Sequence, residues 1–448
     1  MVLFLGFVAA LVGMMLVSFN SGQVTNAKMR AMNAADAAAY SGAVFEARSL
    51  NFQAYMNRAM VVNEVAIAQS VSLRSWTDYI ARFVTNVNYI TQLIPGVGAV
   101  TTSIAQVVNQ INNGVQNFLP PFVENASRTL NVFEHQAQIV FNAGTVPVAA
   151  QLASNVAQAN GAEVSPGGYA LIAENEIKWL AFTDTYDKNH GPAGASGDGR
   201  KRLRDVMLNS RDGFTRARDW KLTVLIEQIR KQGGTDLVNY DTWKGMDSAA
   251  LCNLTLKGWK CPTPLGWGGA QAYYGKSPDT TVGKHGDNSD WGRNDGKLAQ
   301  FRANTSNAKK LNAPLQGYRD LQDLKTKNAA ALRIPFAIEV VIPNKQIATA
   351  NNSFKARAAL TDGSTIEHDP QFAGGDKGGV YAVAEACVSF ERPYKAERKG
   401  ATEMPSLFNP YWRASLATEA ADTRATVDII KGLPPITLLT GGKGSCRT

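Results

Sequence analysis

The chain has 448 residues, of which 45% are hydrophobic and 19% are charged. So apolar a composition excludes a disordered protein. At roughly 100 to 200 residues per domain, the length predicts two or three folded units. The net charge of +9 is spread thinly along the sequence, whereas a nucleic-acid partner requires a concentrated basic face. We therefore expect no nucleic-acid binding.

The first 27 residues contain no charged side chain, and Val2 to Phe19 are apolar apart from Ser18. A helix of about 18 apolar residues just spans a bilayer. A secretory signal would carry Lys or Arg before this stretch and a small-residue cleavage site after it, so we expect the sequence to begin at or near a processing point. Two interpretations follow: an uncleaved membrane anchor, or a helix that leaves the membrane to become the core of a filament.

The same helix is predicted to continue far beyond the apolar stretch. From Gln23 to Leu93 there is no proline and one glycine, Gly42, and apolar residues recur at three- and four-residue steps. We therefore predict one long helix over residues 1–94, with residues 1–27 as its membrane or filament core. At 1.5 Å per residue it would be about 135 Å long, which indicates packing along an axis.

Residues 95–160 are predicted to form a helical hairpin or small bundle. Pro95 and Gly96 end the long helix, and three low-charge helical stretches follow: Thr101–Phe118, Val123–Asn142 and Val146–Asn160. Their polar positions are often Asn or Gln, where a solvent-facing helix normally carries Lys and Glu. This composition suits burial against identical neighbours, or it is a habit of a secreted protein, and both interpretations stay open.

Residues 161–448 are predicted to form a loop-rich globular domain with an antiparallel sheet. The strongest strands are Leu332–Pro343 and Gly379–Arg392, where β-branched and aromatic residues cluster and alternate. Weaker patterns predict strands at Glu174–Phe182 and Ser353–Leu360, helices at Gly213–Gln232 and Pro410–Lys431, and an irregular insertion over residues 233–316, which holds many glycines and four tryptophans. The fold class expected for the whole chain is α+β.

Four cysteines lie in the second half of the sequence. An even number in this part fits an oxidising compartment. Four cysteines allow three pairings, of which Cys252 with Cys261 and Cys387 with Cys446 is the simplest. The first pair would close a local loop, and the second would hold the C-terminus to a predicted strand.

Catalytic and metal-binding signals are sparse. The sequence has no nucleophile elbow, phosphate-binding loop or zinc-protease motif, and its four histidines are scattered. It also lacks the paired Cys or His ligands of a zinc site. Asp287, Asp290 and Asp295 lie in a Gly/Asn-rich loop that would offer oxygens to calcium, but their spacing is not that of an EF-hand, and a solvated loop is the default. We expect no enzyme activity, no catalytic residue, no cofactor and no metal site.

Two segments resemble a known family. Met29 to Arg48 reads MRAMNAADAAAYSGAVFEAR, and Pro405 to Leu416 reads PSLFNPYWRASL. Both resemble phrases of TadE/TadG-like proteins of Tad/Flp pilus assembly, which have a hydrophobic N-terminal helix followed by a similar alanine-rich motif. The resemblance implies a pilin-like plan, although Leu5 stands where type IV pilins usually carry a glutamate.

Taken with the apolar helix, the resemblance predicts an assembly role of one of two kinds. The first is the structural subunit of an extracellular cell-surface filament, a helical homo-oligomer that passes through the inner membrane and meets pilus or secretion machinery before assembly. The alternative is a low-copy, TadG-like membrane-anchored periplasmic component of the assembly machine. Copies that leave the membrane would have to bury the apolar helix against one another. The predicted assembly helix comprises Leu3, Phe4, Gly6, Phe7, Ala10, Gly13, Met14, Val17, Ala35, Asp36 and Ala39.

Within this set the small residues would permit close helix approach. Asp36 is the exception, since it is an acid in an alanine-rich seam. Two roles stay open for it: a solvated helix face, or an ion pair with a basic residue of a neighbouring subunit that sets the register. A buried unpaired charge would be costly.

Overall fold

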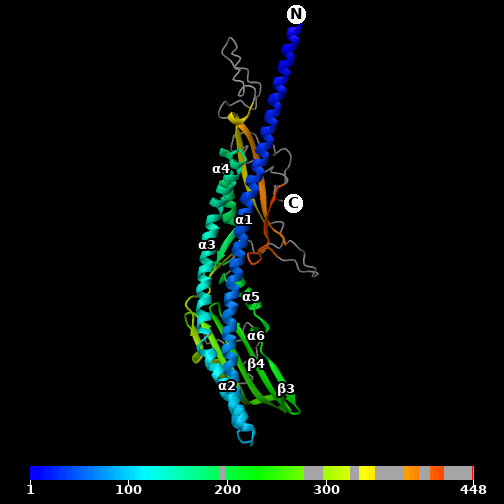
Figure 1. Cartoon of the computed structure of the whole chain (residues 1–448). Helices are drawn as coiled ribbons and strands as arrows, with labels where there is room; N and C mark the ends of the chain where they lie inside the picture. Colours follow the sequence, from blue (N-terminus) through cyan, green and yellow to red (C-terminus); the bar gives the residue numbers. More distant parts are fainter. Residues whose placement is uncertain are drawn as a thin grey trace. The chain divides into compact units, whose positions relative to one another are not determined.

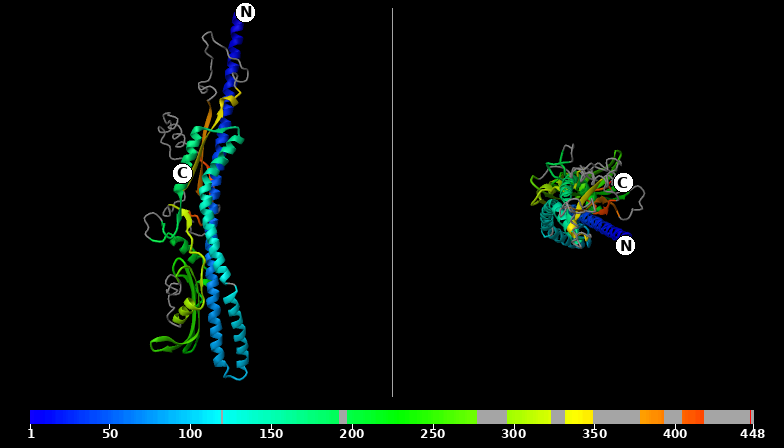
Figure 2. Two further views of the ribbon diagram at one scale, coloured as in Figure 1. Left: turned by 90° about the vertical axis from the view of Figure 1, so that its left-hand side faces the viewer. Right: turned by 90° about the horizontal axis from the view of Figure 1, so that it is seen from above.

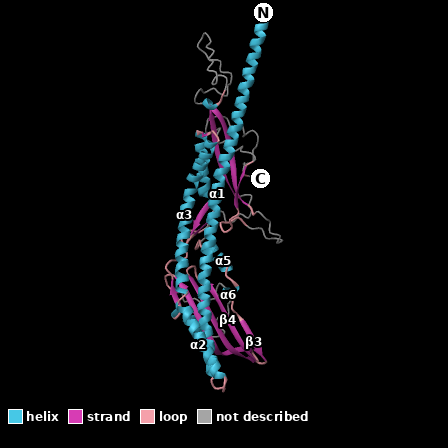
Figure 3. Ribbon diagram, in the orientation of Figure 1, coloured by secondary structure: helices cyan, strands magenta, loops and turns pink. Residues whose placement is uncertain are grey.

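The computed structural model describes residues 1–118, 120–191, 197–276, 296–322, 332–348, 378–392, 404–417 and 446, without the side chains of residues 120, 296, 297 and 300. The chain divides into two compact units. Unit 1 comprises Met1–Ala54, Val140–Asp184 and Asp320–Thr448, and unit 2 comprises Tyr55–Ile139 and Thr185–Arg319. Each unit combines helices from the first part of the sequence with strands from the second, so the fold is α+β as predicted. Figure 3 shows the helices and strands by colour.

The long N-terminal helix is confirmed as α1, Val2–Thr91. A turn containing Gly96 follows, with a φ of 84° that favours glycine. The chain then returns through α2, Val97–Asn117, and α3, Pro120–Ala159. Both run antiparallel to α1 (Figure 1): in unit 2 the Thr101 hydroxyl donates to Asn88 Oδ1 at 2.8 Å, and in unit 1 the Ser49 and Thr145 hydroxyls are 2.6 Å apart. The predicted hairpin is therefore present.

The two helices predicted at Val123–Asn142 and Val146–Asn160 are a single helix, which corrects the sequence interpretation. α3 continues through Gly144 and Pro147. The Thr145 hydroxyl donates to the Phe141 carbonyl at 2.8 Å, and Val146 and Ala149 are buried in the core of unit 1. Tertiary burial on this face outweighs the hydrogen bond that a proline removes.

Unit 1 is built around a four-stranded sheet with the order β1-β9-β10-β11. The predicted strands Leu332–Pro343 and Gly379–Arg392 are confirmed as β9, Arg333–Pro343, and β10, Gly379–Phe390. They pair antiparallel over their full length, with Gly379 opposite Pro343 and Ser389 opposite Arg333. β1, Glu163–Val164, and β11, Trp412–Leu416, extend the sheet on either side.

Two weaker predictions for unit 1 are wrong. Residues Glu174–Phe182 lie in a helix, α4, Pro166–Phe182, because Ser165 caps its start by accepting a hydrogen bond from the Gly168 amide at 2.9 Å. Residues 412–416 of the predicted helix Pro410–Lys431 are strand β11 instead. The rest of that helix from residue 418, like the predicted strand Ser353–Leu360, lies outside the described residues. A short 3-10 turn, η2, Asn344–Gln346, follows β9.

The core of unit 1 lies between α1, α3 and the sheet. Alternate residues of β9 (Ile334, Phe336, Ile338, Val340 and Ile342) pack with the alanines of α1 and α3. On the opposite face Ala337 packs with Leu171 of α4. Helices therefore cover both faces of this sheet.

Unit 2 contains a five-stranded sheet where the irregular insertion was predicted. Its order is β3-β4-β5-β6-β7, antiparallel except for the parallel pair β6–β7. The strands are β3 Trp220–Val224, β4 Glu227–Leu237, β5 Thr242–Thr255, β6 Gly258–Tyr273 and β7 Ala308–Lys310. Helices α5 Lys201–Asn209, α6 Gly213–Arg216 and α7 Gly296–Thr305 complete the unit, and β2 Thr183–Tyr186 pairs with β8 Tyr318–Leu321.

The predicted helix Gly213–Gln232 is also wrong, since only its first turn is helical and the rest forms β3 and the start of β4. The glycines that indicated an irregular region serve close packing instead. A Cβ at Gly268 would lie 2.3 Å from the Ser75 carbonyl of α1, and one at Gly266 would lie 2.8 Å from Phe83 Cβ. Glycine in these strands therefore lets α1 pack directly on the sheet.

Candidate assembly helix and its anchoring in unit 1

The first part of α1 presents an apolar surface that nothing in the described chain covers. Every residue from Met1 to Phe19 is exposed, with Leu3 at 92% and Phe4 at 72%. An 18-residue window of this helix has a mean hydropathy of 2.6, which is long and apolar enough to cross a membrane. A Cβ added at Gly6 or Gly13 would meet no atom within 4 Å. These side chains are free to face lipid or other chains.

The predicted assembly residues that face outward are therefore Leu3, Phe4, Gly6, Phe7, Ala10, Gly13, Met14 and Val17.

The alanine seam beyond this stretch packs within the same chain. Ala35 and Ala39 are 1% and 0% exposed and belong to the unit 1 core together with the strands β9 and β10. At Gly42 an added Cβ would lie 2.3 Å from the Phe336 ring, so this ring packs directly on the helix backbone. The small residues thus allow close approach of α1 to its own sheet.

Asp36 is exposed, and partial burial of its carboxyl raises its pKa. Nearby on α1, Lys28 Nζ donates to the Tyr381 carbonyl of β10 at 2.5 Å. A further acid one turn past the alanines, Glu46, is fully buried, and desolvation raises its pKa well above the usual range. Apolar packing and the Lys28 contact therefore help to hold α1 to the sheet of unit 1, while Asp36 faces outward.

Comparison with known proteins adds one finding on this helix. Residues 1–44 match the family model of Flp pilus-assembly TadE/G-like proteins. The N-terminal segment is therefore similar to TadE/G-like proteins. No curated protein and no solved structure matches the chain. The match confirms the resemblance predicted from the sequence, and its range covers both the exposed apolar stretch and the alanine seam.

The second resembling phrase, PSLFNPYWRASL, lies in the same unit as residues 1–44. Asn51 of α1 makes two hydrogen bonds to this segment. The Asn51 side-chain amide donates to the Trp412 carbonyl at 2.8 Å, and the Trp412 backbone amide donates to Asn51 Oδ1 at 3.0 Å. The Trp412 ring is buried between Phe182 and Phe390, with ring centroids 5.6 and 5.3 Å away. The two segments that carry the family resemblance therefore belong to one folded core.

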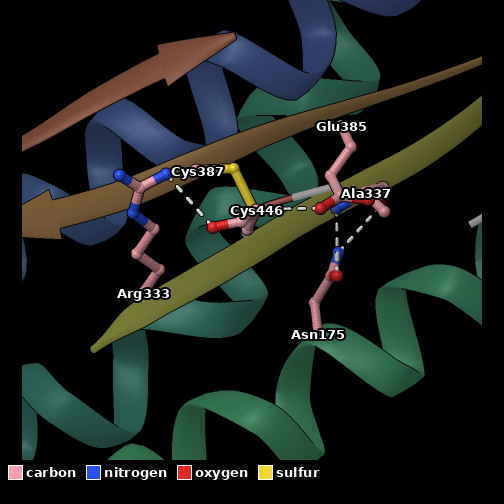
Figure 4. Close-up of a disulfide and its surroundings, with 6 residues drawn as sticks. All are labelled: Asn175, Arg333, Ala337, Glu385, Cys387 and Cys446. Carbon is pink, nitrogen blue, oxygen red and sulfur yellow. Dashed lines mark hydrogen bonds between the residues drawn. A yellow bond between two sulfur atoms is a disulfide. The ribbon is translucent and has the colours of Figure 1, made fainter. Parts of the chain in front are cut away.

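Both predicted disulfides are present. Cys252 pairs with Cys261 across strands β5 and β6, and Cys387 of β10 pairs with Cys446. Figure 4 shows the second bond, beside which Arg333 Nη1 donates to the Cys446 carbonyl at 3.1 Å. The Glu385 carboxylate lies close to both sulfurs, but sulfurs joined in a disulfide offer no thiolate to a metal.

Figure 4 also shows how α4 closes an open stretch of the sheet edge. The Asn175 side chain donates to the Ala337 carbonyl at 2.8 Å and accepts from the Ala337 amide at 3.0 Å. An edge strand otherwise leaves such groups unpaired. This contact was not predicted, because residues 174–182 were expected to form a strand.

Unit 2 contains buried ionic clusters that the sequence analysis did not predict. Asp247 is fully buried and accepts hydrogen bonds from Arg218 Nε at 2.9 Å, Lys231 Nζ at 2.5 Å and the Ser75 hydroxyl at 2.6 Å. Burial alone would raise the pKa of Asp247, but Arg218 and Lys231 lower it below the usual range. Burial lowers the pKa of Lys231. Each group is satisfied by structural partners.

A second cluster centres on Glu64 of α1. Its carboxylate accepts from Arg128 Nη2 at 3.0 Å, Asn131 Nδ2 at 2.8 Å and Trp243 Nε1 at 2.8 Å. One signal was available in the sequence: residues 1–160 hold only 13 charged side chains. In so charge-poor a region, an isolated acid or base is a candidate for a buried pair.

Proposed function

We propose that this protein is a membrane-anchored component of a Flp/Tad pilus system. The observation that carries the proposal is the division of α1 at about residue 27. From Met1 to Phe19 every residue is exposed, whereas Ala27, Ala31 and Ala34 are buried in unit 1. The exposed part matches the thickness of a bilayer, and the TadE/G-like match supports involvement in pilus assembly. The disulfides support an extracytoplasmic site for the folded units.

A second candidate is the structural subunit of an extracellular filament. One observation favours it: Gly6, Ala10 and Gly13 follow one another at four- and three-residue steps, so they share one face of the exposed helix. Such a small-residue face permits close helix packing. In this case the same helix would leave the membrane and pack against its copies. The proposed chemistry in both cases is assembly, without catalysis.

Substitutions at Gly13 separate the two candidates. Gly13→Arg places a charge in the apolar stretch at a cost of about 2.5 to 3.5 kcal/mol in a membrane, and should reduce the carbonate-resistant membrane fraction. Gly13→Leu keeps the helix apolar but blocks close approach. Neither the Arg nor the Leu side chain should clash within one copy of the protein, because no atom lies within 4 Å of a Cβ added at Gly13.

The expected result for an anchored component is that Gly13→Leu behaves as wild type, with the chain in the membrane and absent from sheared surface fibres. Fibres that contain the wild-type chain and are lost on Gly13→Leu, with membrane retention unchanged, would establish the filament subunit instead. If the Gly13→Arg variant stayed in the membrane fraction after carbonate extraction as fully as wild type, the anchoring role of this helix would be refuted.

A further inference from the structure

The helical hairpin in unit 2 has its polar and apolar faces reversed with respect to an ordinary soluble hairpin. Figure 2 shows α2 beside α1, and hydrogen bonds between the two helices come from polar side chains of α2. Thr101 donates to Asn88 Oδ1 at 2.8 Å, and the Gln116 amide donates to the Arg74 carbonyl at 2.9 Å. Its apolar face is therefore left outside the hairpin.

That outer face carries a regular apolar seam. It consists of Val97, Val100, Ile104, Val107 and Ile111. Their spacing of three and four residues is the a/d pattern of a coiled coil, and each is between 41 and 60% exposed. Within α2 only Ala105 is buried. A soluble helix normally buries such a stripe.

The charge pattern identifies the kind of partner. Between Arg82 and Glu124 the sequence contains no Asp, Glu, Lys, Arg or His. A charged partner would find no complementary group there. A lipid surface is also disfavoured, because helices that lie on membranes usually carry Lys or Arg on their polar face. A second copy of the same uncharged helix brings an equal seam and no like-charge repulsion.

We propose that the seam of α2 is a homotypic contact, in which two or more copies of this chain pair through Val97, Val100, Ile104, Val107 and Ile111. β-Branched residues at both a and d positions favour bundles of more than two helices. The seam spans little more than two heptads, so the contact alone is weak. It gains strength where copies are confined together, because confinement raises their effective concentration.

The proposal is tested by cysteine cross-linking between differently tagged copies of the full-length protein in native membranes. Ile104→Cys lies on the seam, and Gln106→Cys is an exposed control on the same helix off the seam. Oxidation should yield about tenfold more intermolecular disulfide at position 104, because a-position side chains of paired helices face one another.

A second pair of variants tests the seam itself. Val100→Lys with Val107→Lys, in the Ile104→Cys background, should abolish the cross-link. Ala99→Lys with Gln106→Lys adds the same charge beside the seam and should leave it intact. All four positions are exposed in one copy, so the substitutions leave the fold of unit 2 unchanged, which retention of the Cys252–Cys261 disulfide checks.

Equal cross-linking at positions 104 and 106 would overturn the proposal, as would a cross-link confined within one copy. Vesicle flotation that depends on the seam, with no cross-link at 104, would assign the face to lipid and equally overturn it. The inference does not depend on which pilus role the chain has. Failure here would leave the membrane fractionation of the Gly13 variants unaffected, so the two failures are distinguishable.

Discussion

Glu46 is a buried acid whose replacement should stabilise unit 1. It lies on α1 with an exposed fraction of 0%, and among the described residues neither carboxylate oxygen has a hydrogen-bond partner. A buried polar group left unsatisfied costs about 1 to 3 kcal/mol. We therefore expect Glu46→Leu to raise the free energy of unfolding by that amount at neutral pH. Glu46→Gln should gain less, because its amide remains unsatisfied.

The stability gained by Glu46→Leu should increase with pH. Desolvation raises the pKa of Glu46 in the folded state, so the folded protein holds a proton that the unfolded chain releases above about pH 4.3. Wild-type stability therefore falls as pH rises from there to the folded-state pKa. The advantage of Glu46→Leu should accordingly be small near pH 4 and larger at neutral pH.

Urea unfolding of the full-length protein in detergent, followed by tryptophan fluorescence, measures this difference at several pH values. Glu176→Leu is the matched control, since Glu176 is an exposed acid of α4 in the same unit, and surface substitutions usually change stability by less than about 0.5 kcal/mol. A Glu46→Leu gain that is absent at neutral pH, or that does not change with pH, would refute the assignment of an unpaired buried carboxyl.

Two further substitutions test contacts that lie inside a single unit, the first in unit 2 and the second in unit 1. Asp247→Asn leaves Arg218 and Lys231 buried without their anion, and urea unfolding should show a loss of about 3 to 5 kcal/mol in the free energy of unfolding. In the wild type the pKa of Asp247 is lowered. The stability that this acid contributes is therefore present at neutral pH and is lost as pH falls through its folded-state pKa. Asn51→Ala removes both hydrogen bonds to the Trp412 backbone and should lower the free energy of unfolding by about 1 to 3 kcal/mol. Proteolysis of the C-terminal segment should become faster. An unchanged rate of proteolysis would show that packing of the Trp412 ring alone holds this segment.

Local sequence signals predicted the elements whose burial pattern is simple. α1 is read correctly because helix-compatible residues run without proline from Gln23 to Leu93. β9 and β10 are read correctly because each is rich in β-branched and aromatic residues and lies in the middle of a sheet. The disulfide pairing follows from the shortest loops. These features depend mainly on neighbours in sequence.

Several errors lie where distant packing decides the structure. Residues 233–273 were predicted as irregular because of their glycines, but some of these glycines are needed for the approach of α1, as Gly268 against Ser75 shows. The pattern of residues 174–182 fits a strand, yet the Ser165 cap and Pro166 begin a helix that continues through them. The continuous α3 likewise depends on core burial around Pro147. The packing partners of Gly268 and of the Pro147 region are not visible from local periodicity, whereas the Ser165 cap with Pro166 is a local signal that the strand prediction overlooked.

The alanine seam changes what the apolar helix can do for assembly. Sequence alone permits a helix–helix interface from residue 1 to residue 43, but Ala35 and Ala39 are already covered by the sheet of the same chain. Ala35 and Ala39 are therefore not available for close contacts between copies, whereas Gly6, Ala10 and Gly13 supply a small-residue face in the exposed stretch before Ala27. That stretch is about as long as a membrane span, so its burial in lipid and its burial against copies compete for the same residues. An anchored chain buries this stretch in the bilayer. A filament subunit has to exchange that lipid contact for contact with other copies along the whole exposed helix.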